Sequence, residues 1–382
     1  MFSGGDTPRH SNLKQFWKVA LFLLLIFQNT PSIAKESVKI GFVGGLTGKL
    51  SDLGTAGRNG VILAVEERNA AGGLLGKKIE LLTRDDKQDP KEAIKVDEEL
   101  IGQGVIAIIG HMTSAMSMAA KPLIDAKKVL MISPTTSTSA LAGQKDFFFR
   151  VNETIEGEAK QLSEFVIKKR GLRTLKGVYD LSNRAYTEDY YHHFKSHYRE
   201  MGGKILDPET FVSGEKKEFS SMVKNIQKSN PQGLFILASA SDTATICQQI
   251  FKLGWKVPLV LSGWSMTDEL ARLGGRSVEG VFSVITYDSD SQNPLFQKFL
   301  KRFSERFGGE PGFPGLCGYE AAFVLFKTYE EAKGKVEKLP ETMIKIKTFQ
   351  GLQGEIQIDE YGDAKRPKFI TIIQNSKFKV IK

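Results

Sequence analysis

From residue 37 onward, short apolar runs alternate with longer amphipathic stretches. Residues 38–43 and 105–109 are typical of buried strands, and residues 54–69 and 91–103 carry apolar positions at helical spacing. Such alternation is typical of βαβ units, which build parallel sheets. Further strands are predicted at 78–83, 129–132, 175–179, 204–211, 233–238, 258–262, 280–284, 354–358 and 369–374, and further helices at 114–126, 156–169, 188–201, 220–227, 242–253, 294–307 and 319–332.

The βαβ rhythm restarts near Thr154, so we expect two similar sheets in succession. No Pro/Ser-rich linker separates the two blocks, which favours several chain crossings between two lobes over a single tether. The predicted fold class is therefore α/β, with two doubly wound parallel-sheet lobes.

The first residues have the pattern of a secretory signal peptide. Basic residues precede an unbroken apolar run of nine residues, 19–27, which is too short to span a bilayer. Small residues at Ser32 and Ala34 predict cleavage after Ala34. We expect an exported protein without a membrane anchor, in which residues 1–34 are removed.

Composition and charge narrow the class of protein. The chain has 382 residues, 41% of them hydrophobic and 25% charged, which is typical of a globular protein of more than one domain. The formal net charge of +9 is dispersed in short basic groups, so the sequence does not indicate nucleic-acid binding. Cys247 and Cys317 lie in apolar helical contexts, which favours buried thiols, although export would permit a disulfide.

Two polar loops directly follow predicted parallel strands. Residues 110–114 precede a helix that begins at Ser114, and residues 133–139 are rich in serine and threonine. The carboxyl ends of parallel strands and the N-terminus of a helix together favour binding of an anion such as a carboxylate. The alternative is that Ser114 only caps its helix and that residues 133–139 form a solvated loop.

Other motifs give weaker indications. The glycines of 41–48 do not have the dinucleotide-binding spacing, and the acidic residues of 85–89 lack the calcium-loop pattern. His193 and His197 could face one metal ion, but a third ligand is missing. No nucleophile or zinc-hydrolase motif is present, so we expect no enzyme activity, no metal and no cofactor.

The ordered series of motifs resembles the branched-chain amino-acid binding proteins of bacterial ABC importers. The resemblance covers nearly the whole mature chain and rests on short motifs at residues 40–48, 69–76, 85–90, 109–111, 131–134, 149–150, 179–186, 218–219, 279–280 and 362–363. It implies two α/β lobes joined by three crossovers that close over a ligand. The lobes would comprise residues 35–154 plus 287–367 and residues 155–286 plus 368–382.

The resemblance also implies ligand-binding residues. Ser114 and Ser137 would hold a carboxylate, the Thr135 carbonyl would face an α-ammonium group, and Tyr186 would contact the ligand from the second lobe. Thr136 belongs to the same predicted loop site. Leu53 stands where an aromatic wall is usual in the family, and Trp264 would supply an aromatic face instead.

One departure from the family concerns the ammonium group. Gly263 stands where the family's amino-acid binders place an acid. A buried ammonium without a partner is costly, so either another acid substitutes or the ligand lacks an amino group.

The sequence thus predicts a monomeric periplasmic solute-binding protein. It would deliver a branched-chain or aromatic amino acid, or a related small carboxylate, to ABC permease membrane subunits. The alternative is a sensing subunit that presents its closed form to a signalling receptor.

Overall fold

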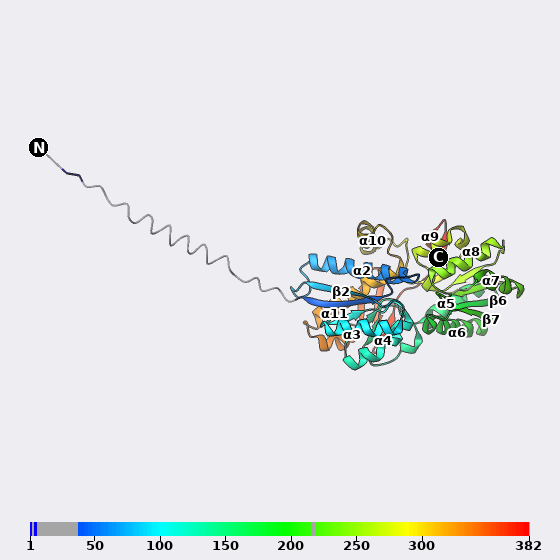
Figure 1. Cartoon of the computed structure of the whole chain (residues 1–382), viewed down its shortest axis with the longest axis horizontal. Helices are drawn as coiled ribbons and strands as arrows, with labels where there is room; N and C mark the ends of the chain where they lie inside the picture. The colour runs from blue at the N-terminus through cyan, green and yellow to red at the C-terminus, as the bar shows by residue number, and fades with distance from the viewer. Residues whose placement is uncertain (2–3, 6–36, 216–217, 382) are drawn as a thin grey trace. The chain divides into compact units, whose positions relative to one another are not determined.

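Two β-sheets, each covered by helices, organise the chain in the computed structural model (Figure 1). The structure describes residues 1, 4–5, 37–215 and 218–381, and the folded unit begins at Ser37. The predicted signal peptide therefore lies outside the described residues, apart from residues 1, 4 and 5. None of the helices in the described part of the chain is long and apolar enough to cross a membrane.

The first sheet is entirely parallel and has the strand order β2-β1-β3-β4-β5. Its strands are β1 (Val38–Gly44), β2 (Ile79–Asp85), β3 (Ala107–Ile109), β4 (Leu130–Ser133) and β5 (Phe148–Arg150). The helices around it are α2 (Ser51–Ala70), α3 (Pro90–Gly102), α4 (Ser114–Lys127), α10 (Pro294–Phe307), α11 (Gly312–Glu331) and α12 (Leu339–Ile346).

Both faces of the sheet are buried at its central strands, which explains the continuous apolar sequence of β3. Ala107 and Ile109 pack in one hydrophobic cluster, whereas the intervening Ile108 packs in another with residues of α3 and α4. Successive side chains of a strand point to opposite faces. The apolar run at 105–109 therefore packs against helices on both faces of the sheet.

The second sheet is mixed and has the strand order β15-β14-β10-β9-β8-β6-β7. Its parallel strands are β6 (Thr174–Asp180), β7 (Lys204–Phe211), β8 (Gly233–Leu237), β9 (Leu259–Leu261) and β10 (Phe282–Ile285). β14 (Phe369–Gln374) and β15 (Lys377–Val380) add an antiparallel edge. The helices of this lobe are α5 (Ile155–Lys168), α6 (Arg184–Glu200), α7 (Phe219–Lys228), α8 (Ala240–Lys252) and α9 (Asp268–Gly274).

The chain passes between the two lobes three times. It leaves the first sheet after β5, returns to α10 after β10, and crosses again between β13 and β14. A small antiparallel sheet precedes the last crossing and consists of β11 (Thr348–Gly351), β12 (Gly354–Ile358) and β13 (Ala364–Lys365). The α/β class with two lobes is confirmed, while the exact lobe boundaries at 154/155, 286/287 and 367/368 stay predictions.

Several elements differ from their sequence-based expectation. α11 begins at Gly312, ahead of the expected residue 319. Gly312, Pro314 and Gly315 have poor helix propensity, so the sequence pattern does not indicate this first part of the helix, and tertiary packing stabilises it. The short strand β5 and the edge strand β15 were not predicted. Both cysteines are buried free thiols, as the apolar contexts favoured.

The backbones of α2 and α11 are in direct contact through glycines. A β-carbon at Gly318 would lie 2.2 Å from the carbonyl oxygen of Gly57, and one at Gly60 would lie 2.1 Å from that of Gly315. Neither carbonyl can move without displacing its helix. The absence of side chains at these positions is therefore a packing requirement.

Gly318→Ala is expected to lower the free energy of unfolding by about 2–3 kcal/mol, because a methyl group would force the two helices apart. Urea unfolding would measure the change. Gly102→Ala is the matched control, since a β-carbon at this helical glycine meets nothing within 4 Å. Equal stability of the two variants would contradict the close-contact interpretation.

Candidate ligand-binding site

A cavity lies between the two lobes. It is bordered by loops that follow the carboxyl ends of β1, β3 and β4 in the first sheet and of β6, β9 and β10 in the second, where open parallel sheets bind ligands. Its lining consists of Leu53, Met112, Thr113, Ser114, Thr135, Ser137, Asn152, Glu158, Asn183, Tyr186, Gly263, Trp264, Val284, Ile285, Thr286 and Phe313.

Hydroxyl groups and a helix N-terminus form one polar end of the cavity. Ser114 is the first residue of α4, and the N–H groups of a first helical turn have no carbonyl partner within the helix. The Ser114 hydroxyl accepts a hydrogen bond from the N–H of Thr138 at 3.4 Å, and Ser137 is buried beside it. Hydroxyl and amide donors at the positive end of a helix can hold a carboxylate without a basic residue.

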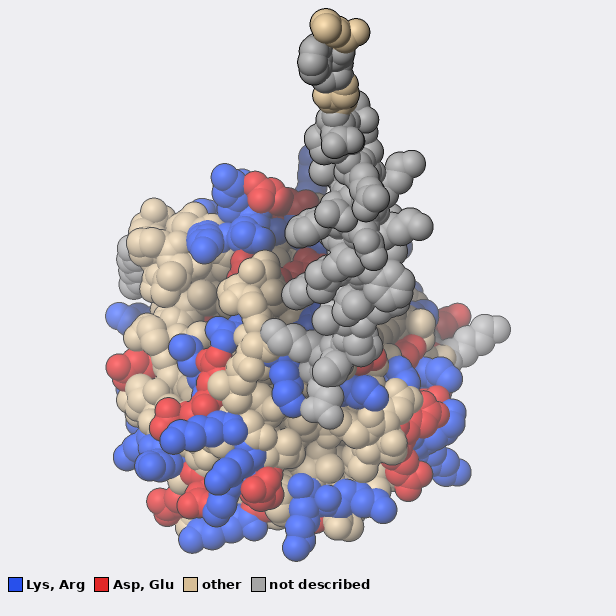
Figure 2. Space-filling view, turned by 90° about the vertical axis from the view of Figure 1, so that its left-hand side faces the viewer, with Lys and Arg blue, Asp and Glu red and all other residues tan. Residues whose placement is uncertain are grey.

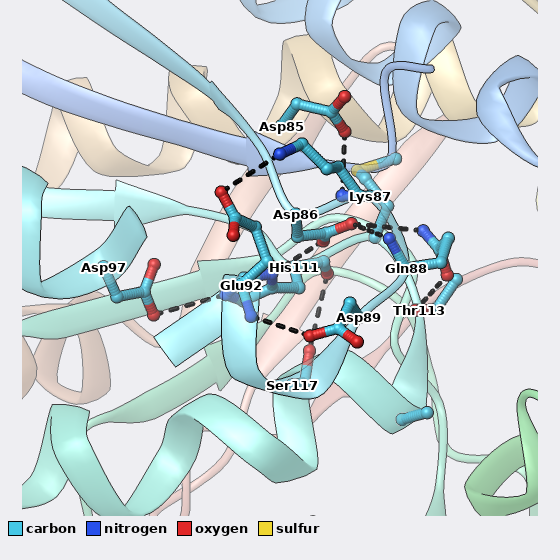
Figure 3. A network of polar contacts seen from close by, with 12 residues as sticks. Asp85, Asp86, Lys87, Gln88, Asp89, Glu92, Asp97, His111, Thr113 and Ser117 are labelled. Atoms are coloured by element: carbon cyan, nitrogen blue, oxygen red, sulfur yellow. Dashed lines mark hydrogen bonds and ion pairs between the residues drawn. The ribbon is translucent and has the colours of Figure 1, made fainter. Parts of the chain in front are cut away.

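A buried histidine between two carboxylates supports this loop (Figure 3). His111 Nδ1 lies 2.8 Å from Asp86 Oδ2, and His111 Nε2 lies 3.2 Å from Asp97 Oδ2. All three side chains are fully buried. Burial disfavours the charged imidazole, but the two carboxylates prevail and raise the pKa of His111 to about 10. The ion pairs thereby fix the segment that leads into Ser114.

Thr136 has a different place from its neighbours. It is buried but is not part of the cavity lining. Its hydroxyl lies 2.7 Å from that of Ser117 and donates to the His111 carbonyl at 3.3 Å. Thr136 therefore braces one loop against the other behind the cavity wall.

The other expected residues all line the cavity. Leu53 and Thr135 lie on the first lobe, and Tyr186 and Trp264 form an aromatic wall on the second, with ring centroids 6.0 Å apart at 82°. Further apolar residues line the cavity: Met112 and Phe313 from the first lobe, and Val284 and Ile285 of β10 from the second. Phe313 comes from the part of α11 that the sequence pattern missed.

Four polar lining residues lie outside the predicted site: Asn152, Glu158, Asn183 and Thr286. Asn152 and Glu158 lie around the first crossing of the chain, and each has a buried side-chain oxygen, Asn152 Oδ1 and Glu158 Oε1, without a hydrogen-bond partner. The sequence offered a weak signal for Glu158, because acidic residues in the first turn of a helix are common for dipole reasons alone.

Hydrogen bonds join the two lobes around the cavity. Asn183 Oδ1 accepts from the N–H of Ala115 at 3.1 Å, and Asp189 of α6 accepts from the Ser139 N–H at 2.7 Å. On another side, Thr267 donates to Asp52 Oδ2 at 2.7 Å. These contacts link residues far apart in sequence, so the structure has the lobes closed on each other.

The histidine pair on α6 has other partners. His193 Nε2 lies 3.4 Å from Asp189 Oδ1, and His197 Nδ1 lies 3.6 Å from Glu200 Oε2. Among the described residues, no group of three or more His, Cys, Asp or Glu side chains could hold a metal ion. Figure 2 shows basic and acidic side chains intermixed on the visible face, without a continuous basic stripe there.

Comparison with known proteins agrees with this architecture. Residues 37–377 match the family described as periplasmic binding protein. The leucine-, isoleucine-, valine-, threonine- and alanine-binding protein of Pseudomonas aeruginosa is 24% identical over 340 residues, which cover 88% of this chain and 90% of the relative.

Solved structures are similar over most of their length. A leucine binding protein from Thermotoga maritima has a TM-score of 0.84 and 28% identity, with 90% of this chain and 98% of that chain covered. A solute binding protein from Rhodopseudomonas palustris in complex with benzoate has a TM-score of 0.83 and 20% identity, with 91% of this chain and 96% of that chain covered. At this identity the similarity establishes a shared fold only.

The relatives are binding proteins and not enzymes. The fold, the cavity between the lobes and the match over residues 37–377 lead to one conclusion: this chain belongs to the periplasmic binding protein family.

Proposed function

We propose that this protein captures a branched-chain or aromatic amino acid, or a related small carboxylate, and delivers it to the membrane subunits of an ABC importer. The observation that carries the proposal is the cavity itself, which combines hydroxyl and helix-end donors at Ser114 and Ser137 with an apolar and aromatic wall. The relatives named for leucine or solved with benzoate bind small carboxylates with apolar bodies, which supports the same ligand class.

Closure of the lobes would bury the ligand, and the closed form would be what the permease recognises. A ligand shifts the equilibrium between open and closed forms only by its difference in affinity for them. The bonds of Asp189 and Asn183 across the lobes would form together with the ligand contacts. We further propose that the protein acts as a monomer in the periplasm, after cleavage near Ala34.

Thermal unfolding of the chain from residue 35 onward tests ligand capture. Leucine, isoleucine and phenylalanine, each with its deaminated counterpart, are the probes. A ligand at 100 times its Kd stabilises the native state by about 2.7 kcal/mol, which raises the melting temperature by several degrees. A panel without any shift would contradict the proposed function.

Ser114→Ala tests the carboxylate end. We expect the Kd of every binding probe to rise roughly tenfold or more, because a hydrogen bond to a charged group is lost. Isothermal titration would measure the change. Ser196→Ala, at an exposed position on α6, is the control and should leave the Kd unchanged. An unaltered Kd in Ser114→Ala would remove Ser114 from the site.

A further inference from the structure

Glu158 is the charged side chain of the cavity. Among the described residues of the lining, it alone carries a formal charge. Its side chain is 8% exposed, and Oε1 is buried without a hydrogen-bond partner. The Tyr190 hydroxyl and the Gly263 N–H lie nearby and favour the ionised form of Glu158, but neither has the geometry of a hydrogen bond to Oε1. A buried carboxylate oxygen with no partner is a costly arrangement that a ligand could relieve.

The charges around Glu158 do not balance. Lys368 Nζ lies 3.7 Å from Glu158 Oε2, but it lies closer, at 3.2 Å, to Glu153 Oε2. One cation is therefore shared by two carboxylates, which leaves this cluster with a formal charge of −1. Burial raises the pKa of Glu158, and Lys368 only partly opposes this. One further positive charge at Oε1 would neutralise the cluster.

Gly263 makes room for this carboxylate. A β-carbon at Gly263 would lie 3.0 Å from Glu158 Oε1 and 3.0 Å from the Val284 carbonyl oxygen. A side chain at 263 would therefore compete with Glu158 for the same space. The glycine and the glutamate, 105 positions apart, form one structural unit at the cavity wall.

Oε1 of Glu158 is an acceptor without a donor, in a cluster with a formal charge of −1. A positively charged hydrogen-bond donor would therefore suit it best. A second orphaned acceptor, Asn152 Oδ1, lines the same cavity and adds to this preference. Donor groups for an anion are supplied separately by the start of α4 and by Ser137. The cavity therefore offers one group for a carboxylate and another for a cation, as a zwitterion requires.

We propose that Glu158, seated in the space left by Gly263, binds the ammonium group of the ligand and makes the site selective for amino acids over their deaminated counterparts. This inference rests on the proposed function, because it assumes that a small carboxylate occupies the cavity.

Two matched pairs of probes test the selectivity: leucine with 4-methylpentanoate, and phenylalanine with 3-phenylpropanoate. Isothermal titration of the unaltered protein should give a Kd for one amino acid at least about 100-fold below that of its partner acid, because the acid leaves Glu158 unpaired. Glu158→Gln should reduce this ratio to below about tenfold. Glu156→Gln is the control: it changes an exposed carboxylate in the same first turn of α5, outside the cavity lining, and should keep the ratio.

The outcomes separate this inference from the proposed function. Tight binding of the deaminated acids by the unaltered protein would overturn the role of Glu158 and leave solute capture intact. Binding of none of the four probes would instead contradict the ligand class itself, and with it this assignment. An unchanged ratio in Glu158→Gln would also overturn the proposal.

A second variant covers the case in which Glu158→Gln does not fold. Gly263→Ala places a methyl group against Oε1 and should lower the selectivity ratio at least tenfold while Glu158 remains. A Gly263→Ala protein that keeps the full ratio would contradict the proposal. Thermal unfolding without ligand would establish that each variant is folded before titration.

Discussion

Glu320→Gln is expected to lower the free energy of unfolding by about 3–5 kcal/mol, which is a large part of the stability of a protein. Glu320 of α11 and Arg366 form an ion pair with Nη2 and Oε2 at 2.6 Å, and both side chains are at most 2% exposed. A guanidinium group cannot release its proton to escape a buried site. The amide would therefore leave a buried positive charge without a counterion.

This ion pair lies where the chain passes between the lobes. Arg366 Nη1 also donates to the Val151 carbonyl at 3.2 Å, and Glu320 Oε1 accepts from the Leu352 N–H at 2.7 Å. It thus fastens the first and third crossings to α11. We expect its loss to weaken the crossings as well as the core.

Urea unfolding of three proteins would test this expectation. The double variant Glu320→Leu with Arg366→Met should recover much of the lost stability, because it removes both charges together. Glu269→Gln is the control, since its partner Arg272 is 67% exposed and such pairs contribute about 0–1 kcal/mol. A single Glu320→Gln variant as stable as this control would refute the argument.

A second large effect is expected as pH rises. The carboxylates of Asp97 and Asp86 hold the pKa of buried His111 at about 10, above its ordinary 6.5. The contribution of protonated His111 to the free energy of unfolding is therefore fully present below about pH 6.5. That contribution is lost progressively as pH rises to about 10, and it amounts to several kcal/mol, because a pKa that is higher by one in the folded state corresponds to about 1.4 kcal/mol.

Urea unfolding at several pH values between 6 and 10 would measure this loss. Asp97→Asn removes the larger coulombic contribution, so its decline should begin at a lower pH. His197→Gln, at a partly exposed position on α6, should follow the unaltered protein. A stability that stays constant over this range would show that His111 is neutral in the folded state.

Much of the fold could be predicted because burial on two sides leaves a clear pattern. The strands around Ile108 and Val260 are continuous apolar runs, and their ends coincide with polar loops. The direction of parallel strands then places residues 110–114 and 133–139 at one edge. The local pattern and the strand direction together were enough to predict that Ser114, Thr135 and Ser137 lie at the cavity.

Other elements left too little local signal. α11 begins with glycines and a proline, whose poor helix propensity is offset by close packing against α2. The antiparallel pairing of β14 with β10 depends on which edge of the second sheet is free, and this is a property of the assembled sheet. Phe313 reached the cavity only through these tertiary contacts.

The α/β class and the hydroxyl-rich end of the cavity could be predicted from the chain alone, because both follow from local patterns of a few residues. The missing acid at Gly263 was also visible there. Glu158, in contrast, came to that space through the folding of distant segments, beside a lysine shared with Glu153. The charge and the room available to a ligand depend on such side chains from separate segments, and no local pattern records the distances between them.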